Sequence, residues 1–358
     1  MFRILAFTVK PRESADTRHR ILQYQTPAEQ AGMVIDHCSL MGRAYFRWQI
    51  RNAHVTLRVL LYPALFLKRL WQVLFLAPRY DSIWISREMA PFGPPVLERL
   101  LVRRCKRVIL DMDDALHIAD KKSASLIPSL LRDRGKFGRM ASRYSAVVCG
   151  NRLLAEYYSQ RSARTHIVPT VVEAERYAGL RRTPSPVVRI GWIGTPLNGH
   201  HLEALGRPLA ALAREREFEL VIVGLNKPLR WDLPRVRYLQ WELEQELSYF
   251  TGFDIGIMPL LDSAFARGKC AFKLIQCMAA GLPVAASPVG SNVEVVEHGK
   301  NGFLAATDDE WRSALRLLLD DPELRRRMGE HGRDLVRRNY SVEATWPRYS
   351  AILRGAAC

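Results

Sequence analysis

The chain of 358 residues is long enough for two ordinary domains, and its 48% hydrophobic and 25% charged residues leave little room for long disordered segments. Its formal net charge of +17 comes mainly from the first half of the chain. The six cysteines include no C-x-x-C pair and no Cys/His cluster with zinc spacing, which argues against a structural zinc site and favours a reduced, cytoplasmic protein.

The first half contains five apolar runs that we interpret as strands separated by helical stretches. In chain order they are RILAFTV, YDSIWIS, RVILDMD, YSAVVCG and THIVPT. The opening run is too short for a signal peptide and fits a first strand better, so we expect the protein to stay inside the cell. The alternation of strand and helix predicts a Rossmann-like domain over residues 1–175.

One segment of this half is both strongly basic and strongly apolar. No acidic residue occurs between His37 and Tyr80, whereas basic residues stand at Arg43, Arg47, Arg51, Arg58, Lys68, Arg69 and Arg79. Arg58, Lys68 and Arg69 divide the apolar run into pieces that are too short for a membrane span. We therefore expect a helix that lies in the interface of an anionic membrane. A core helix with solvated arginines and a nucleic-acid surface are the alternatives, although no RNP, zinc-finger or helix-turn-helix signature is present.

The second half alternates strand and helix patterns in the manner of a doubly wound sheet. Prolines and a loss of periodicity between residues 169 and 186 indicate the hinge, and we expect a second domain over 176–342 and a helix over 343–358 that packs back toward the first domain. The predicted strands are RIGWIG, FELVIVG, VRYLQW, DIGIMPL, PVAAS and GFLA, and ELEQELSYF is predicted as a helix. The motifs SNVE and TDDE have capping-box spacing at helix starts, which gives Glu294 a structural role as an alternative to ligand binding.

Two lysines stand at the start of a helix that otherwise has a buried pattern, in GKCAFKLIQCMAAGLPV. Lys269 and Lys273 are four residues apart and therefore lie on one face of that helix start. In open α/β sheets, ligands bind beyond the carboxyl ends of the strands, where helix N-termini favour anions. The pair predicts a diphosphate site, and the alternative is that both lysines point to solvent.

The stretch KLIQCMAAGLPVAASPVGSNVEVVEHGKNGFLA resembles the carboxyl-terminal signature of family 4 glycosyltransferases. The resemblance extends through IGWIGTP, FELVIVG and DPELRRRMGEHGRDLVRRNYS over nearly all of residues 188–342, and it is weaker at RHRILQY, YDSIWISRE, DMDDAL and VVCGN. It implies a GT-B arrangement, α/β with two Rossmann-like domains facing a central cleft. It also implies a retaining enzyme that uses a nucleotide-sugar donor without a metal or other cofactor.

The chain departs from the family pattern at two glutamates that are usually eight positions apart. Gly268 and Gln276 occupy those positions, and Gln276 can still hydrogen-bond ribose hydroxyls. The Arg and Lys that usually follow the first strand of the second domain are absent from GTPLNGHHL, so we infer that Lys269 and Lys273 supply that positive charge. The predicted donor-binding residues are Gly194, Thr195, Lys269, Lys273, Gln276, Gly290, Ser291 and Glu294, with Lys269 also catalytic.

The acidic motif DMDDAL leaves three interpretations open. Asp113 or Asp114 caps the next helix, Asp113 acts catalytically near the donor sugar or the acceptor, or the cluster binds a metal as in single-domain transferases. We favour the first two and expect no metal site. Predicted acceptor-binding residues from the same sheet edge are Arg18, Arg20, Tyr24, Arg87 and Glu88.

The predicted function is sugar transfer from a nucleotide-sugar to a saccharide or lipid-linked acceptor, in surface polysaccharide or glycolipid synthesis. We expect the enzyme to be cytoplasmic and peripheral on the inner face of the membrane, without a nucleic-acid partner. The alternative is a non-catalytic nucleotide-sugar-binding or scaffold protein of the same fold.

Overall fold

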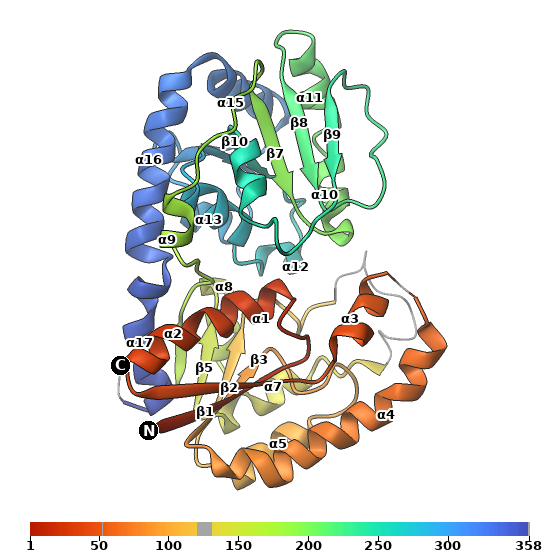
Figure 1. Cartoon of the computed structure of the whole chain (residues 1–358), viewed down its shortest axis with the longest axis vertical. Helices are drawn as coiled ribbons and strands as arrows, with labels where there is room; N and C mark the ends of the chain where they lie inside the picture. The colour runs from red at the N-terminus through yellow and green to blue at the C-terminus, as the bar shows by residue number, and fades with distance from the viewer. Residues whose placement is uncertain (52, 120–130, 357–358) are drawn as a thin grey trace. The chain divides into compact units, whose positions relative to one another are not determined.

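The computed structural model describes residues 1–51, 53–119 and 131–356, and the chain divides into two compact units. Unit 1 comprises Met1–Thr170 and Thr345–Cys358, and unit 2 comprises Val171–Ala344. Each unit has its own parallel six-stranded sheet (Figure 1). The structure thus separates the units at residue 170, a few residues before the boundary that the sequence suggested.

The sheet of unit 1 has the strand order β2-β1-β3-β4-β5-β6. Its central strands β3, β4 and β5 are buried at every residue, as expected for a parallel sheet covered on both faces. The strands are β1 (Phe2–Thr8), β2 (Met33–Ser39), β3 (Ser82–Ser86), β4 (Val108–Met112), β5 (Ala146–Cys149) and β6 (Thr165–Ile167). All five predicted strands of this half are confirmed, whereas β2 was missed because Asp36 and His37 interrupt its apolar pattern at the sheet edge.

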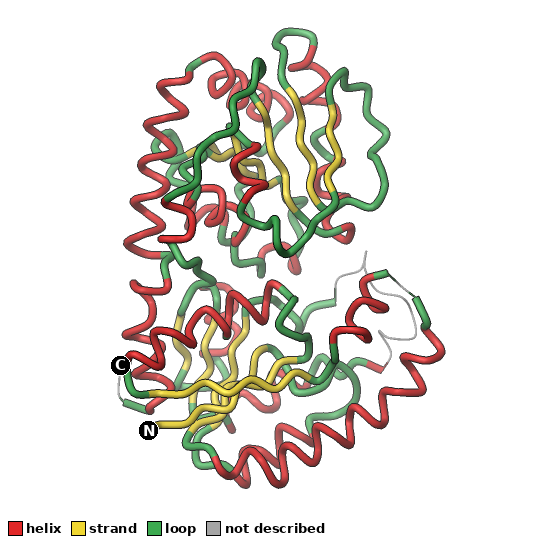
Figure 2. The backbone as a smooth tube through the Cα atoms, in the orientation of Figure 1, coloured by secondary structure: helices red, strands yellow, loops and turns green. Residues whose placement is uncertain are grey.

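The described helices of unit 1 surround this sheet (Figure 2). The final helix contributes Tyr349 to the core, where its ring lies 4.6 Å from Trp84 and 5.0 Å from Tyr24. The helices are α1 (Ala15–Arg20), α2 (Gln25–Gln30), α3 (Arg43–Ile50), α4 (Val55–Trp71), α5 (Val96–Arg104), α7 (Lys136–Met140), α8 (Arg152–Ser159) and α17 (Val342–Arg354). A π-helical turn at Gln72–Leu76 and a 3-10 turn at Ala77–Arg79 prolong α4.

The sheet of unit 2 has the order β12-β11-β10-β7-β8-β9, and every pairing is parallel. The strands are β7 (Arg189–Ile193), β8 (Glu219–Val223), β9 (Val236–Leu239), β10 (Ile255–Met258), β11 (Val284–Ala286) and β12 (Gly302–Leu304). Each of the six predicted strands is confirmed. Their carboxyl ends therefore meet at one edge, which is the edge where ligands bind in such sheets.

Helices cover both faces of this second sheet, in agreement with a doubly wound topology. One hydrophobic cluster includes residues of α13 and α16, and the other includes residues of α11 and α15. The helices are α9 (Glu175–Ala178), α10 (Gly199–Glu203), α11 (Gly206–Ala213), α12 (Ala264–Arg267), α13 (Phe272–Ala279), α14 (Asn292–Val295), α15 (Asp308–Asp320) and α16 (Pro322–Asn339), with 3-10 turns at Pro196–Asn198 and Ser248–Gly252.

Two local predictions in unit 2 gave opposite outcomes at helix starts. The capping box TDDE is confirmed, because the Thr307 hydroxyl accepts from the Glu310 amide and the Glu310 carboxylate accepts from the Thr307 amide. The predicted capping box at SNVE is wrong, because Ser291 precedes α14 but its side chain makes no capping hydrogen bond. The predicted helix over residues 242–250 is also wrong, since only the 3-10 turn at Ser248–Gly252 forms there.

Candidate functional site

The loop that follows β7 lies against the end of the neighbouring strand β8. The Gly194 amide donates to the Val223 carbonyl, and Gly224 follows with a positive φ of 93°. A Cβ atom at Gly224 would lie 2.1 Å from the Gly194 carbonyl oxygen, so only glycine fits this close approach. The two glycines therefore allow the loop after β7 to pack directly against the end of β8.

Lys269 reaches this loop from a distant part of the chain. Its ammonium Nζ donates to Asn198 Oδ1 at 3.2 Å, and Asn198 Nδ2 donates to Thr195 Oγ1 at 3.3 Å. Lys269 Nζ also lies 5.3 Å from the ring centroid of Phe265, within cation–π range. The structure therefore brings together Thr195 and Lys269, two residues predicted to bind the donor, through Asn198, which the sequence analysis did not single out.

Lys273 and Gln276 form a second polar chain on α13. Lys273 Nζ donates to Gln276 Oε1 at 3.0 Å, and Gln276 Nε2 donates to the Tyr177 hydroxyl at 3.0 Å. Burial raises the pKa of Tyr177 well above its usual value, so the phenol stays protonated. Burial also raises the pKa of the Cys277 thiol to about 12, outweighing the opposite effect of Lys273.

Gln276 is 0% exposed, and both ends of its amide have protein partners. This placement differs from the expectation that its side chain contacts a ribose, because a fully buried amide reaches no ligand without local rearrangement. Its partner Tyr177 lies 99 residues earlier in the chain, in α9. A pairing at that separation leaves no pattern in the sequence.

The backbone around the two lysines adopts unusual conformations. Ala271 precedes α13 with a φ of +50°, a region that non-glycine residues rarely occupy. Gly290 has a φ of +55°, and a Cβ there would lie 2.3 Å from the Arg267 carbonyl oxygen. The loop after β11 thus touches the segment that carries Lys269, which explains the glycine at 290.

The other two predicted donor residues follow Gly290. The Ser291 side chain is buried, and its hydroxyl finds no hydrogen-bond partner within the described part of the chain. Glu294 is exposed on α14. Both assignments to donor binding stay predictions.

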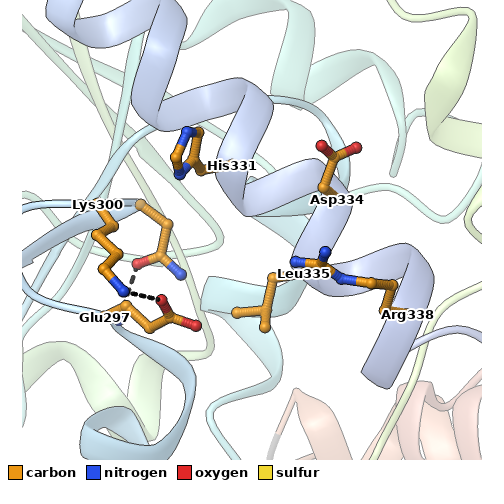
Figure 3. Close-up of a pocket in the computed structure, with 7 residues that line it drawn as sticks. Glu297, Lys300, His331, Asp334, Leu335 and Arg338 are labelled. Atoms are coloured by element: carbon orange, nitrogen blue, oxygen red, sulfur yellow. Dashed lines mark hydrogen bonds and ion pairs between the residues drawn. The ribbon is translucent and has the colours of Figure 1, made fainter.

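A small polar pocket of about 170 Å³ lies elsewhere on unit 2, between α16 and the loop before β12 (Figure 3). Its lining residues are Glu297, Lys300, Asn301, His331, Asp334, Leu335 and Arg338. In the close-up, the ammonium of Lys300 points toward Glu297, with which it forms an ion pair at 3.3 Å. None of the residues predicted to bind the donor lines this pocket.

In unit 1, Arg87 and Asp113 follow the adjacent strands β3 and β4 at the same sheet edge. Arg87 Nε lies 2.5 Å from Asp113 Oδ1 and its Nη2 lies 2.9 Å from Oδ2, a bidentate ion pair. Arg87 also pairs with Asp16 and Asp114, and its backbone has a φ of +69°. Burial by itself would raise the pKa of Asp16, but Lys10 and Arg87 hold it below its usual value.

Asp113 is therefore fixed by an arginine rather than placed at a helix start. Its side chain is 9% exposed. No group of three or more His, Cys, Asp or Glu side chains among the described residues is arranged to hold a metal ion. The catalytic assignment of Asp113 stays a prediction.

Three of the five residues predicted to bind an acceptor are buried in the interior of unit 1, which corrects their assignment. Arg20 is fully buried, where it forms an ion pair with Asp111 and donates to the Val168 carbonyl at 3.0 Å. Tyr24 is buried against the aromatic core, and Glu88 is buried in ion pairs with Arg132 and Lys136. Arg18 is half-buried on α1. Arg87 forms ion pairs with Asp16, Asp113 and Asp114.

Comparisons with known proteins agree with this description. Residues 187–321 match the family model described as glycosyl transferases group 1. D-inositol 3-phosphate glycosyltransferase of Corynebacterium kroppenstedtii is 28% identical over 186 residues, which are 49% of this chain and 39% of that protein. The chain spans less than half the length of the first curated relatives it matches.

Solved structures show the same fold over almost the whole chain. Sucrose-phosphate synthase from Thermosynechococcus elongatus has a TM-score of 0.70 at 16% identity, with 99% of both chains covered. Anabaena HepE in complex with UDP and glucose has a TM-score of 0.62 at 14% identity, again with 99% of both chains covered. The fold is the GT-B fold of these structures, as the sequence predicted.

Proposed function

We propose, from the match of residues 187–321 to the family model of glycosyl transferases group 1, that the chain transfers a sugar from a nucleoside-diphosphate sugar to an acceptor hydroxyl. The acceptor would be a saccharide or a lipid-linked saccharide in the synthesis of a surface polysaccharide or glycolipid. The enzyme would work in the cytoplasm at the inner face of the membrane. The complex of HepE with UDP and glucose supports a nucleotide-sugar as the donor class.

The observation that carries this proposal is the position of Lys269. Its ammonium is hydrogen-bonded to Asn198 in the loop after β7, the loop in which the family usually has its own cations for the diphosphate. Gly194 and Gly224 add no side chain to this loop, which packs directly against the end of β8. Lys269 can thus replace a cation of that loop although it comes from a different part of the chain.

Catalysis would rest on the stabilisation of negative charge. As the bond between the sugar C1 and the phosphate oxygen breaks, charge develops on the leaving diphosphate, and the ammonium groups of Lys269 and Lys273 would stabilise it. The acceptor hydroxyl would attack C1 from the same face, and its proton would pass to the leaving phosphate oxygen. This route retains the configuration at C1 and needs no nucleophilic side chain, which fits glycine at position 268.

A panel of nucleoside diphosphates and nucleotide-sugars tests the donor site by thermal shift. A ligand at about a hundred times its dissociation constant stabilises the folded protein by about 2.7 kcal/mol. Lys269→Ala should weaken binding of the diphosphate roughly tenfold to a hundredfold, because a charge-assisted bond to phosphate is worth about 1.5–3 kcal/mol. Binding of the bare nucleoside should not change.

Lys300→Ala is the matched control, because this lysine also lies on unit 2 but pairs with Glu297 away from the predicted site. The control should bind nucleoside diphosphates like the unaltered protein. Equal losses for nucleoside and nucleoside diphosphate in Lys269→Ala would contradict the phosphate assignment.

A non-catalytic nucleotide-sugar-binding protein is the second candidate. It is favoured by the replacement of two family glutamates by Gly268 and Gln276 and by the burial of the Gln276 side chain. Measuring the release of nucleoside diphosphate distinguishes the two functions, because only a transferase releases it from a bound nucleotide-sugar. Tight binding without release, across the panel and with saccharide and lipid-linked acceptors present, would favour the second candidate.

A further inference from the structure

Helix α4 lies at the border of unit 1 and is held there by one of its faces (Figure 1). Arg69 is fully buried on that face, and its guanidinium donates to the carbonyl oxygens of Thr8 at 2.6 Å and Cys38 at 3.2 Å. Gln72 and Val73 in the following turn are also buried. These contacts anchor α4 to the ends of β1 and β2.

The opposite face of α4 and of the π-helical turn that prolongs it is apolar and exposed to solvent. Its large side chains are Leu60, Leu67, Trp71 and Phe75, which are 70%, 64%, 57% and 55% exposed. Spacings of seven, four and four residues place all four on one side of the helix, and the exposed Pro63 and Ala64 lie between them. We call these six residues the α4 apolar face. Apolar surface concentrated in this way marks an interaction site rather than ordinary scatter.

The charge around the α4 apolar face favours an anionic partner. No acidic residue occurs between His37 and Tyr80, and the exposed basic residues of this segment are Arg43, Arg47, Arg51, Lys68 and Arg79. A second copy of the chain bound through the same face would bring like charges together across a twofold interface. A bilayer with anionic lipids instead matches the apolar face with acyl chains and the cations with headgroups.

The helix and its continuation, Val55–Arg79, also meet the length and composition for crossing a membrane, because an 18-residue window within them has a mean hydropathy of 1.5. The packing of its other face argues for an orientation parallel to the membrane. A crossing helix would have to leave the sheet and carry Arg69 away from its carbonyl partners into hydrocarbon. A helix that lies in the interface keeps those bonds and lets Lys68 and Arg79 reach the headgroups.

We propose that the α4 apolar face inserts into the headgroup–acyl boundary of an anionic membrane and holds unit 1 on its surface. Arg69, which the sequence placed among the cations of this segment, belongs instead to the core and contributes no charge to the membrane contact. The docking goes beyond the proposed transfer reaction and does not depend on the sugar donor.

Vesicle sedimentation tests the proposal with the full chain. The unaltered protein should sediment with vesicles of equal parts phosphatidylcholine and phosphatidylglycerol, and far less with phosphatidylcholine alone. The triple variant Leu60→Gln, Leu67→Gln and Trp71→Gln should bind the anionic vesicles at least about tenfold more weakly, because insertion of its apolar surface is lost. Leu317→Gln on unit 2 alters a comparably exposed leucine and should bind like the unaltered protein.

A charge variant keeps the test independent of folding defects in the triple variant. Lys68→Glu with Arg79→Glu changes exposed side chains only, and each lost cation should weaken binding to anionic vesicles roughly fivefold. Undiminished vesicle binding by both variants would overturn the proposal. So would a dimer of the unaltered protein that the triple variant converts to a monomer, since a second copy would then cover the face. Thermal shift with nucleoside diphosphates, run in parallel, reports separately on the donor site.

Discussion

Gln276 shows how one side chain can link a predicted ligand site to the core. Its amide accepts from Lys273 and donates to Tyr177, so it holds the ammonium at the start of α13 and ties α9 to α13. We therefore expect it to position Lys273, and its predicted contact with a ribose is a separate hypothesis. Substitutions at 276 distinguish the two roles.

Gln276→Leu should lower the free energy of unfolding by about 1–3 kcal/mol, because it leaves the buried Tyr177 hydroxyl and Lys273 without this amide. Gln276→Glu keeps an acceptor for both groups and restores the residue usual in the family, so its stability and nucleotide binding should change little. Urea unfolding and nucleotide titration measure the two effects. A leucine variant of normal stability that no longer distinguishes ribonucleotides from deoxyribonucleotides would instead identify Gln276 as a ribose contact.

At the scale of elements, His37 joins the edge strand β2 to its neighbour β1. Its Nε2 lies 2.8 Å from the Thr8 hydroxyl, close to the anchor of α4. Burial, which is the largest cause, and the nearby cations Arg69 and Arg12 together lower the pKa of His37 to about 4. The folded protein therefore holds this imidazole neutral, whereas the unfolded chain protonates it near pH 6.5.

The depressed pKa makes this part of unit 1 sensitive to acid. The unfolded state binds more protons between about pH 6.5 and pH 4, so stability is fully present above that range and falls as the pH decreases through it. The loss should amount to about 2–3 kcal/mol by pH 4. Urea unfolding at a series of pH values measures it.

His37→Asn is the matched variant, since asparagine can still bond Thr8 but does not titrate. It should have a shallower dependence of stability on pH, with a residual slope from His117, whose pKa burial and Arg161 lower to about 4. An unchanged slope in His37→Asn would show that other groups cause the acid sensitivity.

Across the whole molecule, the sequence predicts strands and helices better than it predicts contacts between residues that are far apart in the chain. Of the twelve strands in the described part of the chain, eleven follow from apolar runs, and the signal is most continuous where a parallel strand is buried on both faces, as in β3, β4 and β5. Arg20 was assigned to a ligand because its partner Asp111 is 91 residues away, and nothing local in the sequence reveals an ion pair inside the core. Asn198 was missed for the same reason, since its importance comes from Lys269, 71 residues later.

The separation of the chain into two units, each with its own sheet and core, predicts two independent ligand footprints. Hydrogen exchange on the full chain should show that a nucleoside diphosphate protects residues 194–198 and 268–276 of unit 2. Anionic vesicles should instead protect residues 55–79 of unit 1. The reason is that a ligand suppresses opening of the segments it contacts and of the cooperative unit to which they belong. Protection of unit 1 alone by the nucleotide would contradict the donor site at Lys269, and vesicle protection confined to unit 2 would contradict docking through α4.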